Sequence, residues 1–216
     1  MERAGKLITF EGPDGSGKST QVQLTARALQ EGGYSVLVTR EPGGTRLSEA
    51  IRGLLLDPCY QEMSPVTEAL LYAGARAQLI SEVILPALAE GKIVLCDRFV
   101  DSSFAYQGYG RGLSLDLLHL INQFALNKLG NFYTILLDLP PKEGLDRSKE
   151  EILRDRLEQE SLEFHQRVRD GYHALARSSP GRIKVIDASL EPEVVQKQIL
   201  EYVSAYLLDQ DQGYPF

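Results

Sequence analysis

The segment Gly12-Pro13-Asp14-Gly15-Ser16-Gly17-Lys18-Ser19 reads GPDGSGKS and matches the pattern G-x-x-x-x-G-K-S at every fixed position. An apolar run, Leu7–Glu11, precedes the segment, and a helical pattern, Lys18–Glu31, follows it. In such a strand–loop–helix arrangement the glycines let the backbone point its N–H groups at phosphate oxygens, and the helix N-terminus adds partial positive charge. The segment therefore predicts a nucleotide-phosphate site, with Lys18 at the outer phosphates and the Ser19 hydroxyl at Mg²⁺.

Short apolar runs alternate with helical patterns along the chain. The runs are Leu7–Glu11, Tyr34–Thr39, Ile93–Cys96, Tyr133–Leu139 and Ile183–Ile186. The helix-like stretches after the first helix are Leu47–Leu55, Pro65–Glu90, Leu113–Leu129, Lys142–Arg177 and Pro192–Leu208. Buried strands separated by helices are typical of a parallel sheet covered on both faces. The sequence therefore predicts an α/β, three-layer fold of the P-loop NTPase type, with a five-stranded parallel sheet flanked by helices and ligands beyond the carboxyl ends of the strands.

The composition is that of one soluble domain. The 216 residues are 43% hydrophobic and 25% charged and contain no long linker or repeat, so we expect a single domain over residues 1–216. No apolar stretch is long enough to cross a membrane, and the chain runs from Met1 directly into the first strand without a signal peptide. These features predict a cytoplasmic protein with no membrane partner. The net charge of −7 argues against a nucleic acid polymer as a partner.

The metal-ligating candidates are oxygen donors rather than thiols or imidazoles. Asp97 ends the third apolar run, where an acidic residue can orient Mg²⁺ and its waters, so Ser19 and Asp97 are the expected metal ligands. No Cys/His cluster has metal-ligand spacing, and Cys59 and Cys96 are expected to be free thiols.

Arginines follow the strands at positions where an anionic ligand is expected. Arg40 and Arg98 come after the second and third runs, and Arg76 lies on the long helix four residues after Tyr72. A guanidinium group binds phosphate through two parallel hydrogen bonds, and Tyr72 and Arg76 share a helix face that can enclose a flat base. Together these residues indicate a site for a phosphorylated acceptor.

A phosphate-binding loop indicates a nucleotide but does not decide between a kinase, a GTP switch and a motor or transporter ATPase. A GTP switch needs Asn-Lys-x-Asp, and the nearest match, Asn127-Lys128-Leu129-Gly130, lacks the Asp. The coupling segments of a motor or transporter are absent from the sequence. A kinase acting on a monophosphate needs no general base, because its acceptor is already anionic with a second pKa of about 6. The sequence contains no clear candidate for such a base, which favours this class.

The ordered set of motifs resembles the bacterial thymidylate kinases. The motifs are FEGPDGSGKST, TREPGGT, LLYAGARAQ, CDRF, SSFAYQGYGRG and DRLEQES, and they lie between residues 7 and 190. The resemblance implies a five-stranded parallel sheet, ATP as phosphoryl donor with Mg²⁺, conversion of dTMP to dTDP, and a homodimer. It also implies that the loop from Gly12 to Thr20 holds ATP together with Arg147.

The resemblance further assigns residues to the acceptor site. Asp14 matches an acid that contacts the 3′-hydroxyl of the acceptor sugar. Arg98 matches the arginine that fixes the acceptor phosphate, with Glu41 and Pro42 near the same phosphate and metal.

Five more residues match positions around the acceptor's base and sugar. Tyr72 stands where the family usually has a stacking Phe, and Arg76 and Ser103 stand where the family hydrogen-bonds the thymine edge. Tyr106 matches an aromatic ring that closes the space a ribose 2′-hydroxyl would need. Gln107 lies beside the same pocket.

A lid is expected near residues 142–160, where charges of both signs are dense. A solvated helix would have the same composition, but a mobile lid would exclude water and bring cations to the transferring phosphoryl group. The phosphate-binding loop has no arginine, and bacterial members of the family compensate with lid arginines. Arg147 matches one of these, whereas the next two are replaced by Lys149 and Glu151. We expect Arg154 or Lys149 to take over the role.

The sequence therefore predicts in-line transfer of the ATP γ-phosphoryl group to thymidine monophosphate. The expected catalytic cations are Lys18, Arg98, Arg154 and Lys149. Two alternatives remain open at this point. One is a kinase for another nucleoside monophosphate or a deoxynucleoside, and the other is a regulatory P-loop NTPase whose output is a conformational change.

Overall fold

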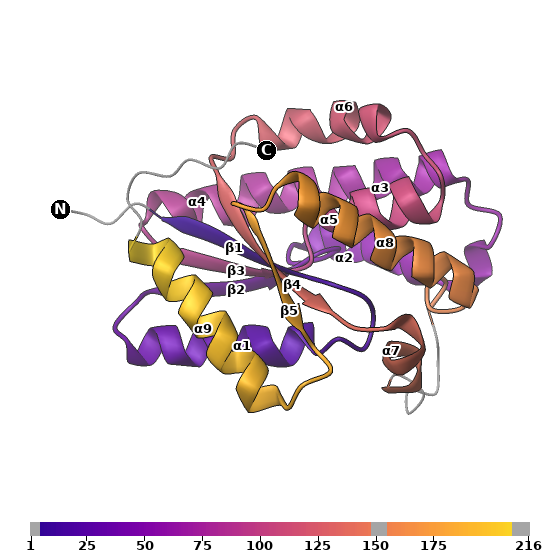
Figure 1. Ribbon diagram of the computed structural model, residues 1–216. Helices are drawn as coiled ribbons and strands as arrows, with labels where there is room; N and C mark the ends of the chain where they lie inside the picture. Colours follow the sequence, from indigo (N-terminus) through magenta and orange to yellow (C-terminus); the bar gives the residue numbers. More distant parts are fainter. Residues whose placement is uncertain (1–4, 148–154, 209–216) are drawn as a thin grey trace.

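The computed structural model describes residues 5–147 and 155–208 and has the α/β architecture that the sequence predicts. The strands are β1 (Lys6–Glu11), β2 (Val36–Arg40), β3 (Ile93–Asp97), β4 (Phe132–Asp138) and β5 (Ile183–Asp187). They pair in parallel, in the order β2-β3-β1-β4-β5 (Figure 1). The strand that precedes the phosphate-binding loop, β1, is therefore at the centre of the sheet.

Helices cover both faces of this sheet. They are α1 (Lys18–Glu31), α2 (Arg46–Leu56), α3 (Pro65–Leu79), α4 (Leu85–Ala89), α5 (Val100–Ser103), α6 (Leu115–Leu126), α7 (Pro141–Arg147), α8 (Leu162–Ser178) and α9 (Pro192–Leu208). Between them lie the 3-10 turn η1 (Pro58–Tyr60) and the π-helical segments η2 (Ile80–Ile84) and η3 (Phe104–Gly110). Figure 1 shows α1 and α9 on one face and α3, α6 and α8 on the other. Among the described helices, none is long and apolar enough to span a membrane.

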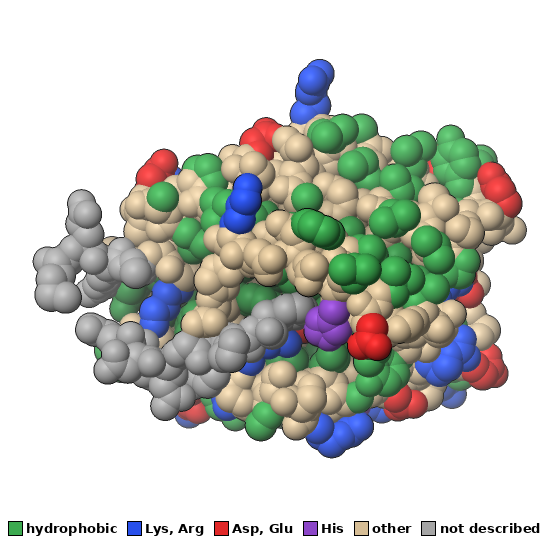
Figure 2. All heavy atoms as spheres, turned by 90° about the horizontal axis from the view of Figure 1, so that it is seen from above, with side chains coloured by type: hydrophobic (Ala, Val, Ile, Leu, Met, Phe, Trp, Pro, Cys, Tyr) green, Lys and Arg blue, Asp and Glu red, His purple; other side chains and the backbone are tan. Residues whose placement is uncertain are grey.

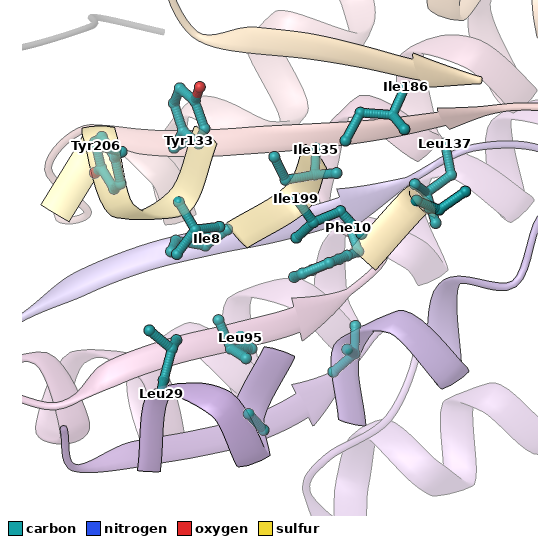
Figure 3. Close-up of a cluster of buried hydrophobic side chains, with 14 of the residues drawn as sticks. Ile8, Phe10, Leu29, Leu95, Tyr133, Ile135, Leu137, Ile186, Ile199 and Tyr206 are labelled. Carbon is teal, nitrogen blue, oxygen red and sulfur yellow. The ribbon is translucent and has the colours of Figure 1, made fainter. Parts of the chain in front are cut away.

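Side chains alternate along each strand between the two faces of the sheet, and they pack into a hydrophobic core on each face. Phe10 and Ile135 belong to the core on the face covered by α1 and α9, and Figure 3 shows them near Ile199 of α9, with Leu29 of α1 near Leu95 of β3. Leu7, the neighbour of Ile8 on β1, belongs to the core on the opposite face, beneath α3 and α6. Because β1 is buried on both faces, its carboxyl end is held rigidly where the loop begins.

The register of the sheet brings three strand ends to one edge. Phe10, Asp97 and Arg40 are neighbours across β1, β3 and β2. Backbone hydrogen bonds from Arg98 N to Phe10 O and from Glu41 N to Asp97 O, each 2.9 Å, continue the ladder by one residue. The loop after β1, Glu41 and Arg98 therefore meet at the edge where the sequence predicts ligands.

Several predicted bounds are wrong for local reasons. The predicted helix Pro65–Glu90 is divided into α3, η2 and α4, because Pro86 has no N–H and its ring does not fit a regular helix interior. The second strand starts at Val36 rather than Tyr34, because the Tyr34 N–H bonds to the Leu29 carbonyl at 3.0 Å in the turn after α1. The predicted helix Leu113–Leu129 is the shorter α6.

The predicted stretch Lys142–Arg177 is also not one helix. It contains α7 and α8, and Ser161 begins α8 by accepting a hydrogen bond from Phe164 N at 3.2 Å, as an N-cap does. Residues 148–154 of the predicted lid lie outside the described residues.

Candidate active site

The loop between β1 and α1 is curled by glycines. Gly12, Gly15 and Gly17 have φ values of 140°, 75° and 83°, which L side chains rarely adopt. Gly17 is the N-cap of α1, and the first turn of α1 has neither a side-chain cap nor an acidic residue. Its first N–H groups and the positive end of the helix dipole are therefore suited to an anion.

Lys18 folds back over this loop. Its Nζ donates to the carbonyls of Gly12 (3.0 Å) and Pro13 (2.7 Å) and to Ser16 Oγ (3.3 Å). Burial, with a further contribution from Arg98, lowers the pKa of the Lys18 ammonium to about 8. Lys18 is therefore mostly charged at pH 7, and its present acceptors are neutral groups that an anionic phosphate can replace.

Ser19 and Asp97 come together between the loop and β3. Ser19 Oγ donates to Asp97 Oδ2 at 2.5 Å. Both side chains carry hard oxygen donors, and Mg²⁺ commonly takes one or two such protein ligands alongside waters and substrate phosphates. The pair therefore fits the ion that the sequence predicts there. Within residues 5–147 and 155–208, no group of three or more His, Cys, Asp and Glu side chains is arranged to hold a metal.

Arg98 lies across the same loop. Its φ of 65° is in the left-handed region, which costs a non-glycine residue about 1–2 kcal/mol. Its guanidinium donates to Asp14 Oδ1 (2.5 Å) and to the Gly12 carbonyl (3.0 Å). The Tyr106 hydroxyl donates to the other Asp14 oxygen at 2.8 Å. The structure thus joins three predicted acceptor-site residues into one hydrogen-bonded group.

Asp14 is ionised throughout the physiological range. Burial alone would raise the pKa of its carboxyl, but the charges of Arg98 and Lys18 outweigh burial and lower it to about 2. Arg98 stays protonated as well: burial opposes its charge, but the neighbouring Tyr106 and Asp14 raise its pKa well above the ordinary value. The group therefore presents one fixed anion and one fixed cation to the cleft.

Arg76 and Glu41 form a buried ion pair. Arg76 Nη2 lies 2.7 Å from Glu41 Oε2, and Arg76 Nη1 donates to Asn122 Oδ1 at 2.6 Å. Arg76 is only 1% exposed, so its guanidinium is engaged mainly by the protein, although it also lines the cleft. Burial raises the pKa of Glu41 to about 7 in spite of the opposing effect of Arg76. Glu41 Oε1 has no hydrogen-bond partner among the described residues.

These groups line one cleft of about 600 Å³, a volume typical of small-molecule sites. The predicted residues that line it are Asp14, Gly15, Gly17, Lys18, Ser19, Thr20, Arg40, Glu41, Pro42, Tyr72, Arg76, Asp97, Arg98, Ser103, Tyr106, Gln107 and Arg147. Gly12, Pro13 and Ser16 belong to the loop without lining the cleft. Lys149 and Arg154 lie outside the described residues.

Ser103 and Gln107 approach the cleft from α5 and η3. Ser103 is 2% exposed, and its Oγ has no hydrogen-bond partner within the described part of the chain. Gln107 Nε2 donates to the buried Glu68 Oε1 at 2.9 Å. A buried hydroxyl without a partner costs about 1–3 kcal/mol, and a ligand in the cleft can supply the missing bond.

Arg40 also lines the cleft, but its guanidinium is paired with Glu49 rather than with the loop after β1. It is half exposed at the rim of the cleft and donates to both carboxylate oxygens of Glu49 at 2.9 Å. Arg52 of α2, which the sequence did not single out, lines the cleft and donates to the Pro42 carbonyl at 3.0 Å. Its position on one face of α2 becomes informative only once α2 is known to pack beside the cleft.

Glu11 is a second residue that the sequence left unassigned. It is fully buried at the end of β1 and accepts hydrogen bonds from Phe99 N (2.8 Å), Ser102 N (3.1 Å), Ser102 Oγ (2.6 Å) and the Tyr172 hydroxyl (2.9 Å). Burial and the nearby Asp101 raise the pKa of Glu11 to about 7. An acid at the end of an otherwise apolar strand was the one sequence signal that could have identified it.

The start of the predicted lid touches the phosphate-binding loop. A Cβ added to Gly15 of the loop would collide with the backbone of Gly144 in α7, and a Cβ added to Gly144 would collide with the Asp14 carbonyl. Arg147, nearly one turn further along α7, lines the cleft and donates to the Ala188 carbonyl at 3.2 Å. Figure 1 shows α7 beyond the carboxyl ends of the strands.

Known proteins share this architecture over most of the chain. A family model described as thymidylate kinase matches residues 10–199. A thymidylate kinase of Bacillus licheniformis is 51% identical over 197 residues, which are 90% of this chain and 93% of that protein. A thymidylate kinase of Symbiobacterium thermophilum is 52% identical over 201 residues, covering 93% and 94%. A crystal structure of thymidylate kinase from Ehrlichia chaffeensis has a TM-score of 0.74 and 34% identity, covering 93% of this chain and 99% of that one.

The raised pKa of Glu41 predicts a pH-dependent cost in stability. The folded pKa of Glu41 is about 7, above its value in the unfolded chain. Between these two pKa values the folded protein keeps a proton on Glu41 that the unfolded chain has released. The free energy of unfolding therefore falls as pH rises through this window. Glu41→Gln removes this titration. We expect wild type to lose stability relative to Glu41→Gln between about pH 4.5 and 7, with a slope of up to roughly 1.4 kcal/mol per pH unit, and the difference to level off above that window. Urea unfolding across this range measures the difference, and a difference independent of pH would contradict the shift.

Proposed function

The chain belongs to the thymidylate kinase family, and on this basis we propose how its residues phosphorylate thymidine monophosphate with ATP. Family membership makes it a phosphotransferase that forms thymidine diphosphate. The role assignments rest on one observation: the Lys18 loop and the Arg98 guanidinium line the same cleft. In-line transfer needs donor and acceptor phosphates to meet head to head, and a cleft lined by both cationic groups supports that arrangement.

The donor side is the loop from Gly12 to Thr20. Its N–H groups and the start of α1 bind the ATP phosphates, and Lys18 leaves the carbonyls of Gly12 and Pro13 to contact the outer phosphates. Ser19 and Asp97 are the residues that would hold Mg²⁺, which neutralises phosphate charge when bound. The buried position of Lys18 strengthens its attraction to phosphate, because water screens it little.

The acceptor side is the group formed by Arg98, Asp14 and Tyr106. Arg98 binds the acceptor phosphate, while Asp14, ionised at every working pH, accepts a hydrogen bond from the sugar's 3′-hydroxyl. Tyr106 is fixed by its bond to Asp14 and limits the space beside the sugar. Because the acceptor phosphate is already anionic, the transfer requires positioning and charge neutralisation without a general base.

Recognition of the base involves the opposite wall. Tyr72 stacks on the thymine, and Ser103 Oγ, which has no partner within the described residues, supplies a hydrogen bond to its edge. Arg76 forms part of the same wall through its contact with Glu41, and Gln107 lies beside it. Arg147 lines the cleft, which supports its proposed role as a lid cation, and Lys149 and Arg154 are further proposed contributors to neutralising the transferring phosphoryl group.

We also propose that the enzyme is a homodimer, which works in the cytoplasm on nucleotides rather than on a nucleic acid polymer. The dimer face is an apolar surface of α3 and α6. Val66 and Leu70 on α3 are 45% and 51% exposed, and Leu120 and Phe124 on α6 are 53% and 74% exposed. Each pair is four residues apart and so lies on one helix face. Figure 2 views the side that carries α6 and shows hydrophobic side chains gathered over it, with charged side chains mostly toward its edges.

A panel of acceptors tests the proposed reaction. With ATP and Mg²⁺, ADP release should be fast with thymidine monophosphate and slow with other nucleoside monophosphates and with thymidine. ADP release that needs no acceptor would favour a regulatory NTPase, and a faster rate with another monophosphate would make that compound the substrate.

Replacing Arg98 by Ala tests the acceptor side. The variant should bind thymidine monophosphate about 2–4 kcal/mol more weakly, because a charge-assisted bond to phosphate is lost, while ATP binding stays within about threefold. Isothermal titration calorimetry measures both affinities. Arg46→Ala, which removes an exposed arginine that does not line the cleft, is the matched control. Equal losses for both nucleotides would remove Arg98 from its assigned role.

Phe124→Asp tests the dimer face. Light scattering of the wild-type protein should give about twice the chain mass of 24.0 kDa, and the variant should give the chain mass, because a charge cannot be buried unpaired in an interface. Leu190→Asp, at an exposed leucine outside this face, should leave the wild-type mass unchanged. A monomeric wild type, or a dimeric Phe124→Asp, would contradict the proposal.

A further inference from the structure

The helix that follows Arg98 is capped from another strand. α5 begins after Phe99, whose side chain cannot accept a hydrogen bond from the first turn, and α5 has no side-chain cap of its own. Glu11 Oε1 accepts from Phe99 N (2.8 Å) and Ser102 N (3.1 Å), the groups at the N-cap and third helical positions. The backbone on both sides of Arg98 is therefore tied to β1, since Arg98 N itself bonds to Phe10 O.

The second oxygen of Glu11 orders two hydroxyl groups. Ser102 Oγ donates to Glu11 Oε2 at 2.6 Å, and the Tyr172 hydroxyl donates to the same oxygen at 2.9 Å. The two hydroxyl oxygens also lie 2.9 Å apart, so one hydroxyl can donate to the other instead of to Glu11. A hydroxyl that donates its one hydrogen to Glu11 leaves its oxygen as an acceptor. Arg98 Nη1 donates to both oxygens at 3.3 Å. In this network Arg98 donates to the two hydroxyl oxygens, and the hydroxyls donate to Glu11.

From this geometry we infer that Glu11 is a positioning residue for Arg98, which sets the guanidinium for the acceptor phosphate without touching the substrate. The inference rests on the proposed role of Arg98. Glu11 fixes the strained backbone at Arg98 through Phe99 N, and it turns the Ser102 and Tyr172 lone pairs toward the guanidinium. Glu11 does not line the cleft, whereas Arg98 does.

Glu11→Gln separates positioning from capping. The amide oxygen of Gln can still accept from Phe99 N and Ser102 N, so α5 keeps its cap. The amide nitrogen is a donor, so it reverses the two hydroxyls, whose hydrogens then face the guanidinium. We expect the variant to fold, yet to bind thymidine monophosphate about tenfold more weakly. Thymidine, which lacks the phosphate, should bind within about twofold of wild type, because Arg98 does not contribute to its binding.

Tyr172→Phe is a second variant that removes one hydroxyl and no charge. This variant should also bind thymidine monophosphate more weakly than wild type, and its affinity for thymidine should be unchanged. Thr9→Val is the matched control: Thr9 is buried two residues earlier on the same strand and bonds to Thr134 at 2.8 Å, away from Arg98. This control should leave both affinities at the wild-type value.

Calorimetric titration of each variant with both ligands tests the inference, and it is repeated in an Arg98→Ala background. The titrations are made at pH 8, because the pKa of Glu11 is raised to about 7 and only the ionised carboxylate accepts both hydroxyl hydrogens. In that background Glu11→Gln should cause no further loss, since there is no guanidinium to position. Equal weakening of both ligands, unchanged or tighter binding of the monophosphate, or an undiminished loss in the Arg98→Ala background would overturn the inference. If Arg98→Ala alone leaves thymidine monophosphate binding unchanged, the proposed role of Arg98 fails as well, and the two failures are thereby distinguished.

Discussion

The contact of Arg98 with the loop after β1 is the constraint on which the site depends. One guanidinium reaches the Gly12 carbonyl and the Asp14 carboxylate, so the proposed acceptor group is bonded to the backbone of the proposed donor loop. The distance between donor and acceptor is then set by the central strands of the sheet. Because β1 and β3 are paired and buried on both faces, neither side can shift alone.

The charged side chains around this contact hold it rigidly, and removing them from water costs free energy of folding. Asp14 is held ionised and Glu41 has a raised pKa, although both carboxyls lie beside arginines. The difference follows from the number of opposing charges: Asp14 faces Arg98 and Lys18, whereas Glu41 faces Arg76 alone. Two carboxyls that line the same cleft therefore differ in charge state near pH 7: Asp14 is a fixed anion, and Glu41 is near its titration point.

The sequence predicted the parts of the site that depend on local spacing. The glycines, Lys18 and Ser19 belong to one continuous segment of the chain, and Asp97 and Arg98 stand at and directly after the end of one strand. Such residues can be identified from the sequence beside them. Glu11, Arg52 and the pairing of Arg40 with Glu49 depend on contacts between separate elements, which no spacing rule reports. The segment Val100–Gly110 was missed for a related reason, since its cap comes from β1 and η3 departs from the 3.6-residue period.

A crystal structure with thymidine monophosphate and a non-hydrolysable ATP analogue bound together tests whether Arg98 and Lys18 hold the two phosphates against each other. In that complex we expect the Arg98 guanidinium to contact the acceptor phosphate and Lys18 to have left the Gly12 and Pro13 carbonyls for the terminal phosphate of the analogue. The two phosphates should face each other in the cleft. An acceptor phosphate bound elsewhere, with Arg98 still held only by Asp14 and Gly12, would contradict this expectation.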